Sequence, residues 1–169
     1  MKLIQSFMLI GLIAMVTACG YRLEGGGYIN EDVTRVAVVV FENKSSETRA
    51  GISFTNQLIQ EIQAKTDTVV VDIDKTTRKI VGVVNSITFS ALARTSTETV
   101  VERQVTAVVD IKLLGPGGDI ILSVKNMTAT ESYQVDADKV NDTASKREAV
   151  DKIALRTAQK VVSQMMNDF

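Results

Sequence analysis

The sequence contains no histidine, no tryptophan, a single cysteine and a single proline. Without histidine, the chain lacks the usual general base of nucleophilic catalysis and the commonest metal ligand. One cysteine excludes a disulfide framework and a cysteine-rich zinc site. The formal net charge of −1 argues against nucleic-acid binding, because nucleic-acid binders usually carry a basic excess. These absences disfavour most enzyme classes, so we expect a non-catalytic protein that acts by binding and needs no cofactor or metal.

The residues that are present suffice for one folded domain. The chain has 169 residues, of which 45% are hydrophobic, and a domain usually has roughly 100–200 residues. No glycine-rich phosphate-binding loop of the G-x-x-x-x-G-K type occurs. The acidic residues Asp72 and Asp74 could hold a cation in principle, but the favoured interpretation is a strand end that enters a polar loop.

The only cysteine, Cys19, follows an apolar segment at the N-terminus. Lys2 is followed by an uncharged, mostly apolar stretch over residues 3–18, which is shorter than the ~20 residues of a membrane-spanning helix. This pattern predicts a secretory signal peptide. The alternative is a plain signal peptide with a chance cysteine.

The residues before Cys19 resemble a bacterial lipobox, although Val16 stands where leucine is usual. The resemblance implies that Cys19 becomes the new N-terminus and carries S-diacylglycerol and N-acyl groups, which together give stable membrane anchoring. Gly20 follows instead of the aspartate that retains enterobacterial lipoproteins at the inner membrane, so we expect the outer membrane. The expected organisation is a signal peptide (1–18), a lipidated N-terminus with a flexible glycine-containing tether (19–32) and a single domain (33–169).

Hydrophobic periodicity predicts the elements of that domain. The first helix is expected over 47–64, with Ile52, Leu58, Ile59 and Ile62 on its apolar face. A second helix is expected from about 142 to 166, with Ser145 and Glu148 as a possible capping box. A Gly-Pro-Gly-Gly turn at 115–118 joins the last two strands. Strands are expected over 33–41, 67–74, 78–91, 100–114 and 120–133.

In outline, these elements predict an α+β two-layer sandwich of order β-α-β-β-β-α, with two helices packed on one face of a mixed sheet. Odd-numbered residues of the strand 100–114 form an apolar row that Arg103 interrupts. The second face of the sheet would be available to a partner.

Four stretches stand out in order along the chain: Cys19-Gly20-Tyr21-Arg22-Leu23, residues 36–43, residues 126–133 and Lys146-Arg147-Glu148-Ala149. Together they resemble the lipopolysaccharide (LPS) assembly lipoprotein family, LptE. The resemblance implies an LptE-like α+β domain that sits inside the outer-membrane barrel LptD, helps to assemble it and binds LPS on its way to the outer leaflet. A polar surface would suit the polar lumen of a barrel.

Contact with LPS would require a local basic cluster. Residues 19–169 carry 18 basic residues (19 less Lys2) and 20 acidic ones, so the domain as a whole does not attract an anion. The candidates for contact with LPS phosphates are Arg94, Arg103 and Lys139, and the alternative for each is a solvated loop charge. Two other functions remain open: an accessory subunit of another envelope complex or a peptidoglycan-associated domain, and, less favoured, a small envelope enzyme.

Overall fold

The computed structural model describes residues 26–30, 32–97 and 99–167. Cys19 and the apolar segment 3–18 lie outside these residues.

A six-stranded mixed sheet has the order β3-β1-β4-β5-β6, and β2 also pairs with β4. The elements are β1 (Arg35–Val38), β2 (Glu42–Asn43), α2 (Ala50–Lys65), β3 (Val69–Val70), the 3₁₀ helix η1 (Ile73–Lys75), β4 (Lys79–Arg94), β5 (Val100–Leu114), β6 (Ile120–Gln134) and α3 (Lys139–Asn167).

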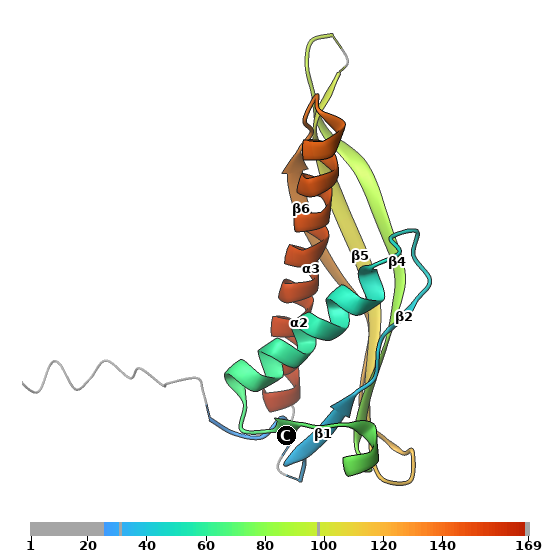
Figure 1. Ribbon diagram of the computed structural model, residues 1–169, viewed down its shortest axis with the longest axis vertical. Helices are drawn as coiled ribbons and strands as arrows, with labels where there is room; N and C mark the ends of the chain where they lie inside the picture. Colours follow the sequence, from blue (N-terminus) through green and yellow to red (C-terminus); the bar gives the residue numbers. More distant parts are fainter. Residues whose placement is uncertain (1–25, 31, 98, 168–169) are drawn as a thin grey trace, which may run out of the picture.

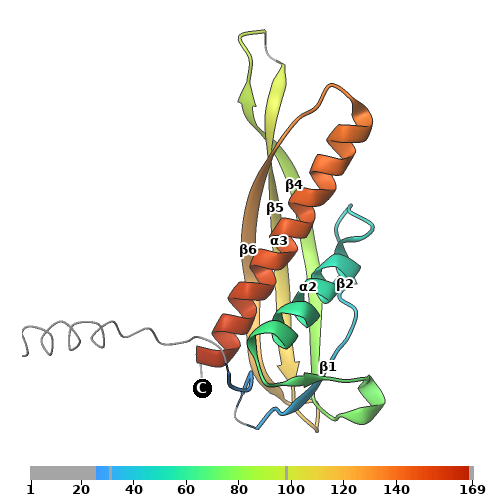
Figure 2. The same ribbon diagram turned by 60° about the vertical axis from the view of Figure 1, so that its left-hand side comes forward.

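Both helices lie on one face of the sheet, and α3 runs along most of its length (Figures 1 and 2). The α+β class with two helices on a mixed sheet is therefore confirmed. The described residues contain six strands, one more than the five predicted strand ranges, because the two-residue strand β2 was not expected. Strands β1, β2 and β3 pair in parallel, whereas β4, β5 and β6 form an antiparallel meander.

The core lies between the helices and the sheet. The odd-numbered residues of β5 from Val105 to Leu113 are buried, with exposed fractions of 1% or less, and this confirms the predicted alternation. The apolar residues predicted to line the second helix are also buried: Val150, Ile153, Ala154, Ala158, Val161, Val162 and Met165.

The predicted apolar face of the first helix was partly wrong. Ile52 is 55% exposed, whereas Phe54 is 2% exposed and packs in the core with Leu58 and Ile62. Positions 54, 58 and 62 are spaced four apart and therefore share one helix face. Ile52 lies two positions before Phe54 and consequently points away from the sheet.

The second helix starts earlier than predicted. It begins at Lys139, and the Asp138 carboxylate accepts the backbone N–H of Val140 at 2.7 Å, so Asp138 is the capping residue. The proposed capping box of Ser145 and Glu148 was wrong, because both residues lie inside the helix. Glu148 instead forms an ion pair with Lys152, at 2.8 Å.

The strand predicted over 67–74 is much shorter. Only Val69 and Val70 pair with β1, and the chain then enters η1, where the Asp72 carboxylate bonds the ammonium group of Lys75 at 2.7 Å. Apolar composition alone therefore overestimated this strand. Asp72 and Asp74 belong to no group of three or more potential metal ligands among the described residues.

Strand β6 forms an edge of the sheet, and its long polar stretch contains a bulge. Two residues, Lys125 and Asn126, stand opposite Asp110, and Asn126 has a positive φ of 53°. The Asp110 carboxylate accepts the Asn126 N–H at 2.7 Å, which holds the bulge. A guanidinium N–H of Arg156 on α3 donates to the Thr130 carbonyl oxygen at 3.1 Å. The bulge and the Arg156 hydrogen bond both hinder the edge strand β6 from pairing with a strand of another molecule.

The described part of the predicted tether packs against the domain. Ile29 is fully buried, and its N–H donates to the Thr68 hydroxyl at 3.0 Å. The Gly27 carbonyl accepts the Asp67 N–H at 2.9 Å. Any free tether therefore ends before Gly27. Neither helix of the described residues is both long and apolar enough to cross a membrane.

Candidate functional site

The three predicted LPS-contact residues come from elements that meet at one end of the domain. Strand β4 ends at Arg94, Arg103 lies near the start of β5, and α3 begins at Lys139. Figure 1 shows the tip of the β4–β5 hairpin and the start of α3 at the same end, which we call the distal end. The structure therefore places residues that are up to 45 positions apart (139 − 94) in the sequence on elements that share one end of the domain.

Arg103 is exposed although it continues the buried row of β5. Its Cα is in register with Ala91 on β4 and Tyr133 on β6. Residues two apart on a strand point to the same face, so Arg103 lies on the helix-bearing face, as does Val105. The apolar row stops at Arg103 because the buried core ends there. Among the described residues its side chain has no ion-pair partner, which leaves the guanidinium free to contact a ligand.

Aliphatic side chains accompany the basic ones at the distal end. Val140, next to Lys139, is 77% exposed, and Leu92, near the end of β4, is 53% exposed. Exposed aliphatic groups beside cations suit a ligand with both apolar and anionic parts. Arg94 has an interaction partner within the chain. Arg103 and Lys139 are therefore the better candidates for contact with an external anion.

The acidic residues of the β6–α3 loop are engaged with the backbone. The Asp136 carboxylate accepts the Asp138 N–H at 2.8 Å, and Asp138 in turn caps α3. These bonds fix the loop that leads to Lys139. The Asp138 carboxylate also occupies an N–H group in the first turn of α3. The anion-binding groups at this end are therefore the basic side chains and not the N-terminus of the helix.

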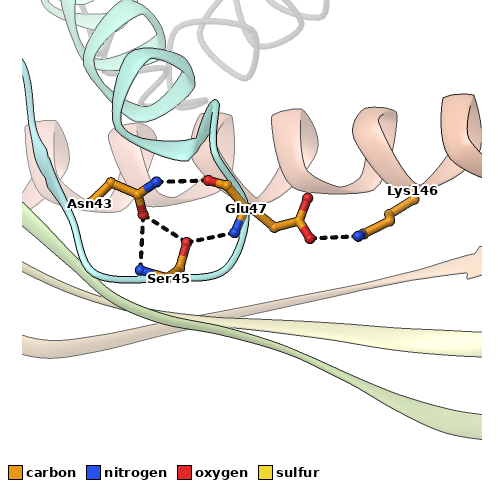
Figure 3. A network of polar contacts seen from close by, with 4 residues as sticks. All are labelled: Asn43, Ser45, Glu47 and Lys146. Carbon is orange, nitrogen blue, oxygen red and sulfur yellow. Dashed lines mark hydrogen bonds and ion pairs between the residues drawn. The ribbon is translucent and has the colours of Figure 1, made fainter.

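A polar network holds the first half of α3 in place (Figure 3). The amide of Asn43 on β2 donates to the Glu47 carbonyl at 2.7 Å, and its oxygen accepts both the backbone N–H (3.0 Å) and the hydroxyl (2.7 Å) of Ser45. A carboxylate oxygen of Glu47 lies 2.5 Å from the ammonium nitrogen of Lys146 on α3. The same ammonium lies 4.4 Å from the centre of the Phe89 ring on β4, a cation–π distance.

This network was not predicted from the sequence. Its end residues, Asn43 and Lys146, lie in two of the stretches that resemble LptE, but spacing along the chain does not show that they face each other. Glu47 was expected to begin a helix. It lies instead in the loop before α2, where its carboxylate can reach across to α3.

A shallow groove also runs between α2 and α3. It has a volume of about 420 Å³ and is lined by residues that include Arg49, Ile52 and Arg147. Both arginines are exposed, and neither forms an ion pair with another described residue. Ile52 was predicted to lie on the apolar face of the helix, but its side chain lines this groove instead.

Comparisons with known proteins identify the fold and the family. The structure resembles that of an uncharacterized lipoprotein B from Nitrosomonas europaea, with a TM-score of 0.59 and 18% identity over 87% of this chain and 90% of the other. It also resembles the rare lipoprotein B from Shewanella oneidensis, with a TM-score of 0.52 and 13% identity over 79% of this chain and 95% of the other. A search of curated proteins finds no match.

The sequence itself matches the profile of the family described as "LptE: Lipopolysaccharide-assembly". The match covers residues 33–165, which include every helix and strand of the domain apart from the last two residues of α3. The chain therefore belongs to the LptE lipopolysaccharide-assembly family.

Proposed function

We propose that the protein is an outer-membrane lipoprotein, anchored through Cys19, that plugs and helps to assemble the LPS-assembly barrel LptD and assists the insertion of LPS into the outer leaflet. Its role is non-catalytic. The observation that carries this proposal is the family match over the whole domain.

The face of the sheet opposite the helices suits the polar lumen of a barrel. On this face Thr88 on β4, Thr106 on β5 and Thr130 on β6 form one row of small hydroxyl side chains across the sheet. These threonines are exposed or half-buried. Hydroxyl groups can both donate and accept hydrogen bonds, so they can match a polar wall without requiring a charge on it.

The distal end is the proposed contact for LPS. Arg103 and Lys139 would pair with phosphate groups, and Leu92 and Val140 would contact apolar parts of the lipid. The net charge of residues 19–169 is −2 (18 basic and 20 acidic residues), so the domain as a whole does not attract anionic LPS. The attraction would come from these few basic side chains at the distal end.

Co-purification tests the barrel partnership. The lipidated protein, tagged at its C-terminus, is extracted from outer membranes in mild detergent, and we expect it to bring down an LPS-assembly barrel in a stable complex. Depletion of the protein should lower surface LPS and increase misassembled barrel. Recovery without the barrel, or with a different envelope complex, would contradict the plug and favour an accessory role elsewhere.

The anchor has a separate test. Replacement Cys19→Ser should leave an unprocessed precursor that no longer incorporates labelled palmitate. Continued labelling of this variant would show that the lipid is attached elsewhere or that Cys19 is not the modified residue.

A further inference from the structure

The groove between α2 and α3 carries a positive charge on a domain that is negative overall. Its lining contains three basic and two acidic residues, which gives a net charge of +1 (3 − 2): Arg49, Lys146, Arg147, Glu47 and Asp151. The net charge of residues 19–169 is −2 (18 − 20). A local excess of positive charge in a concave surface attracts anions, whatever the sign of the whole protein.

Both acidic residues of the groove are engaged with neighbouring side chains, whereas its two arginines are not. The Glu47 carboxylate forms the ion pair with α3, and the Asp151 carboxylate accepts the Ser53 hydroxyl at 2.5 Å. Arg49 and Arg147 are exposed and form no ion pair with another described residue. Because a guanidinium group matches the geometry of a phosphate oxygen pair, the two arginines are suited to bind a phosphate group from outside the chain.

The rest of the groove suits a sugar. Asn56, Gln57 and Gln60 on α2 line it, and an amide side chain both donates and accepts hydrogen bonds, as sugar hydroxyl groups do. Ile52, which is 55% exposed, adds an apolar surface. The volume of about 420 Å³ lies in the range of small-ligand sites. The groove therefore fits a ligand that combines phosphate, hydroxyl and apolar groups.

The groove is continuous along α3 with the proposed LPS contact at the distal end. Lys139 begins α3, and Thr143 and Arg147 line the groove. Residues four apart on a helix are neighbours on its surface, so these three follow one another along one side of α3. The distance along the helix from Lys139 to Arg147 is about 12 Å. An elongated headgroup with a phosphate group at each end can therefore contact both cations at once.

We propose that the groove is a second phosphate-binding site for LPS, in which Arg49 and Arg147 pair with one phosphate group. Arg103 and Lys139 hold another phosphate group at the distal end. This inference rests on the proposed function, because it extends the LPS contact proposed there. The amides of α2 bond to sugar hydroxyl groups, and Ile52 contacts the apolar face of a sugar ring. Two separated contacts align the headgroup with α3, whereas a single contact would leave it able to rotate.

Lipid A, the glycolipid part of LPS, tests the second site in bisphosphorylated and monophosphorylated forms. Equilibrium binding of both is measured on the mature, lipidated protein in detergent. Wild type should bind the bisphosphorylated form about tenfold more tightly, the scale of one charge-assisted contact. Arg49→Gln and Arg147→Gln should each lose this preference. The control, Lys160→Gln, changes an exposed site toward the other end of α3 and should keep it. Arginine variants that retain the tenfold preference would overturn the second site.

The same measurement separates this inference from the proposed function. If Lys139→Gln weakens the binding of both lipids while Arg49→Gln and Arg147→Gln bind as wild type does, the groove is not a site but the distal contact stands. If wild type binds neither lipid, the LPS contact of the proposed function is wrong, and the second site is wrong with it.

A photoreactive amino acid in place of Ile52 provides an independent test in intact outer membranes. The side chain at this position lines the groove, so we expect it to capture LPS on irradiation. The matched control is the same replacement at Ile73, which is 61% exposed and lies in η1, and it should capture no LPS. Capture of an acidic segment of a protein at position 52, without LPS, would overturn the proposal.

Discussion

The ammonium nitrogen of Lys146 lies 2.5 Å from a carboxylate oxygen of Glu47, and this ion pair joins α3 to the loop before α2. Both side chains are at most one-third exposed, so solvent screens the pair less than it screens a surface salt bridge. The pair lies two helical turns from Lys139 and thereby helps to hold the distal end.

Removal of Lys146 should destabilise the domain. Lys146→Ala eliminates the ion pair and the contact with Phe89 and leaves a half-buried carboxylate unpaired, so we expect a loss of about 1–2 kcal/mol. The matched control is Lys152→Ala, whose partner Glu148 is exposed, and it should unfold at nearly the same urea concentration as wild type because solvent screens an exposed ion pair. Urea denaturation of both variants measures the difference, and equal losses would contradict the role assigned to the network.

The two neighbouring apolar residues of α2 should differ sharply in their contribution to stability. Phe54→Ala opens a core cavity and should lower the free energy of unfolding by about 3–5 kcal/mol. Ile52→Ala changes a side chain that is 55% exposed and should cost about 0.5 kcal/mol or less. Thermal and urea unfolding give both values. A large loss for Ile52→Ala would place that residue in the core after all.

The bulge on β6 should make stability depend on acidic pH. The backbone N–H of Asn126 and the side chain of Asn85 bond to the Asp110 carboxylate, and these bonds lower its pKa from the ordinary value of 3.8. A depressed folded-state pKa gives stability that is present above the unfolded-state pKa and is lost as pH falls through the folded-state value. The window therefore lies below about pH 4.

Asp110→Asn tests this dependence because it retains an oxygen acceptor but removes the charge. We expect the variant to be less stable than wild type at pH 6, by about 1 kcal/mol at most, and the difference to shrink as pH falls below 4. Unfolding midpoints measured from pH 6 to pH 2.5 provide the comparison. A difference that is constant over this range would show that the charge of Asp110 is not responsible.

Charge reversal at the distal end should weaken LPS binding. Arg103→Glu and Lys139→Glu each replace a cation with an anion, and we expect an affinity loss of about tenfold for each, the scale of one charge-assisted contact. Lys160→Glu, an exposed site toward the other end of α3, is the control and should bind as wild type does. Equal losses in all three variants would indicate a non-specific charge effect.

Long-range packing explains what could and could not be predicted from the sequence. The strands β5 and β6 and their turn were predictable because strict alternation and a Gly-Pro-Gly-Gly segment are local signals. Phe54 was missed in favour of Ile52, because composition does not show which of two nearby apolar residues meets the sheet. Arg103 became a candidate because it interrupts an apolar row, and its contact with LPS stays a prediction. The ion pair of Glu47 with Lys146 could not be predicted, because its two members are 99 positions apart (146 − 47) in the sequence.

The length of α3 sets a physical scale for the proposed role. At a rise of 1.5 Å per residue, its 29 residues measure about 43 Å, which exceeds the ~30 Å hydrocarbon core of a bilayer. Its C-terminal end lies beside the chain segment that leads to Cys19, and its N-terminal end carries Lys139. A domain anchored in one leaflet and aligned with the membrane normal would therefore present its cations at the depth of the opposite leaflet. One rigid helix would then span the membrane thickness that a lipid headgroup must cross, with no hinge and no moving part.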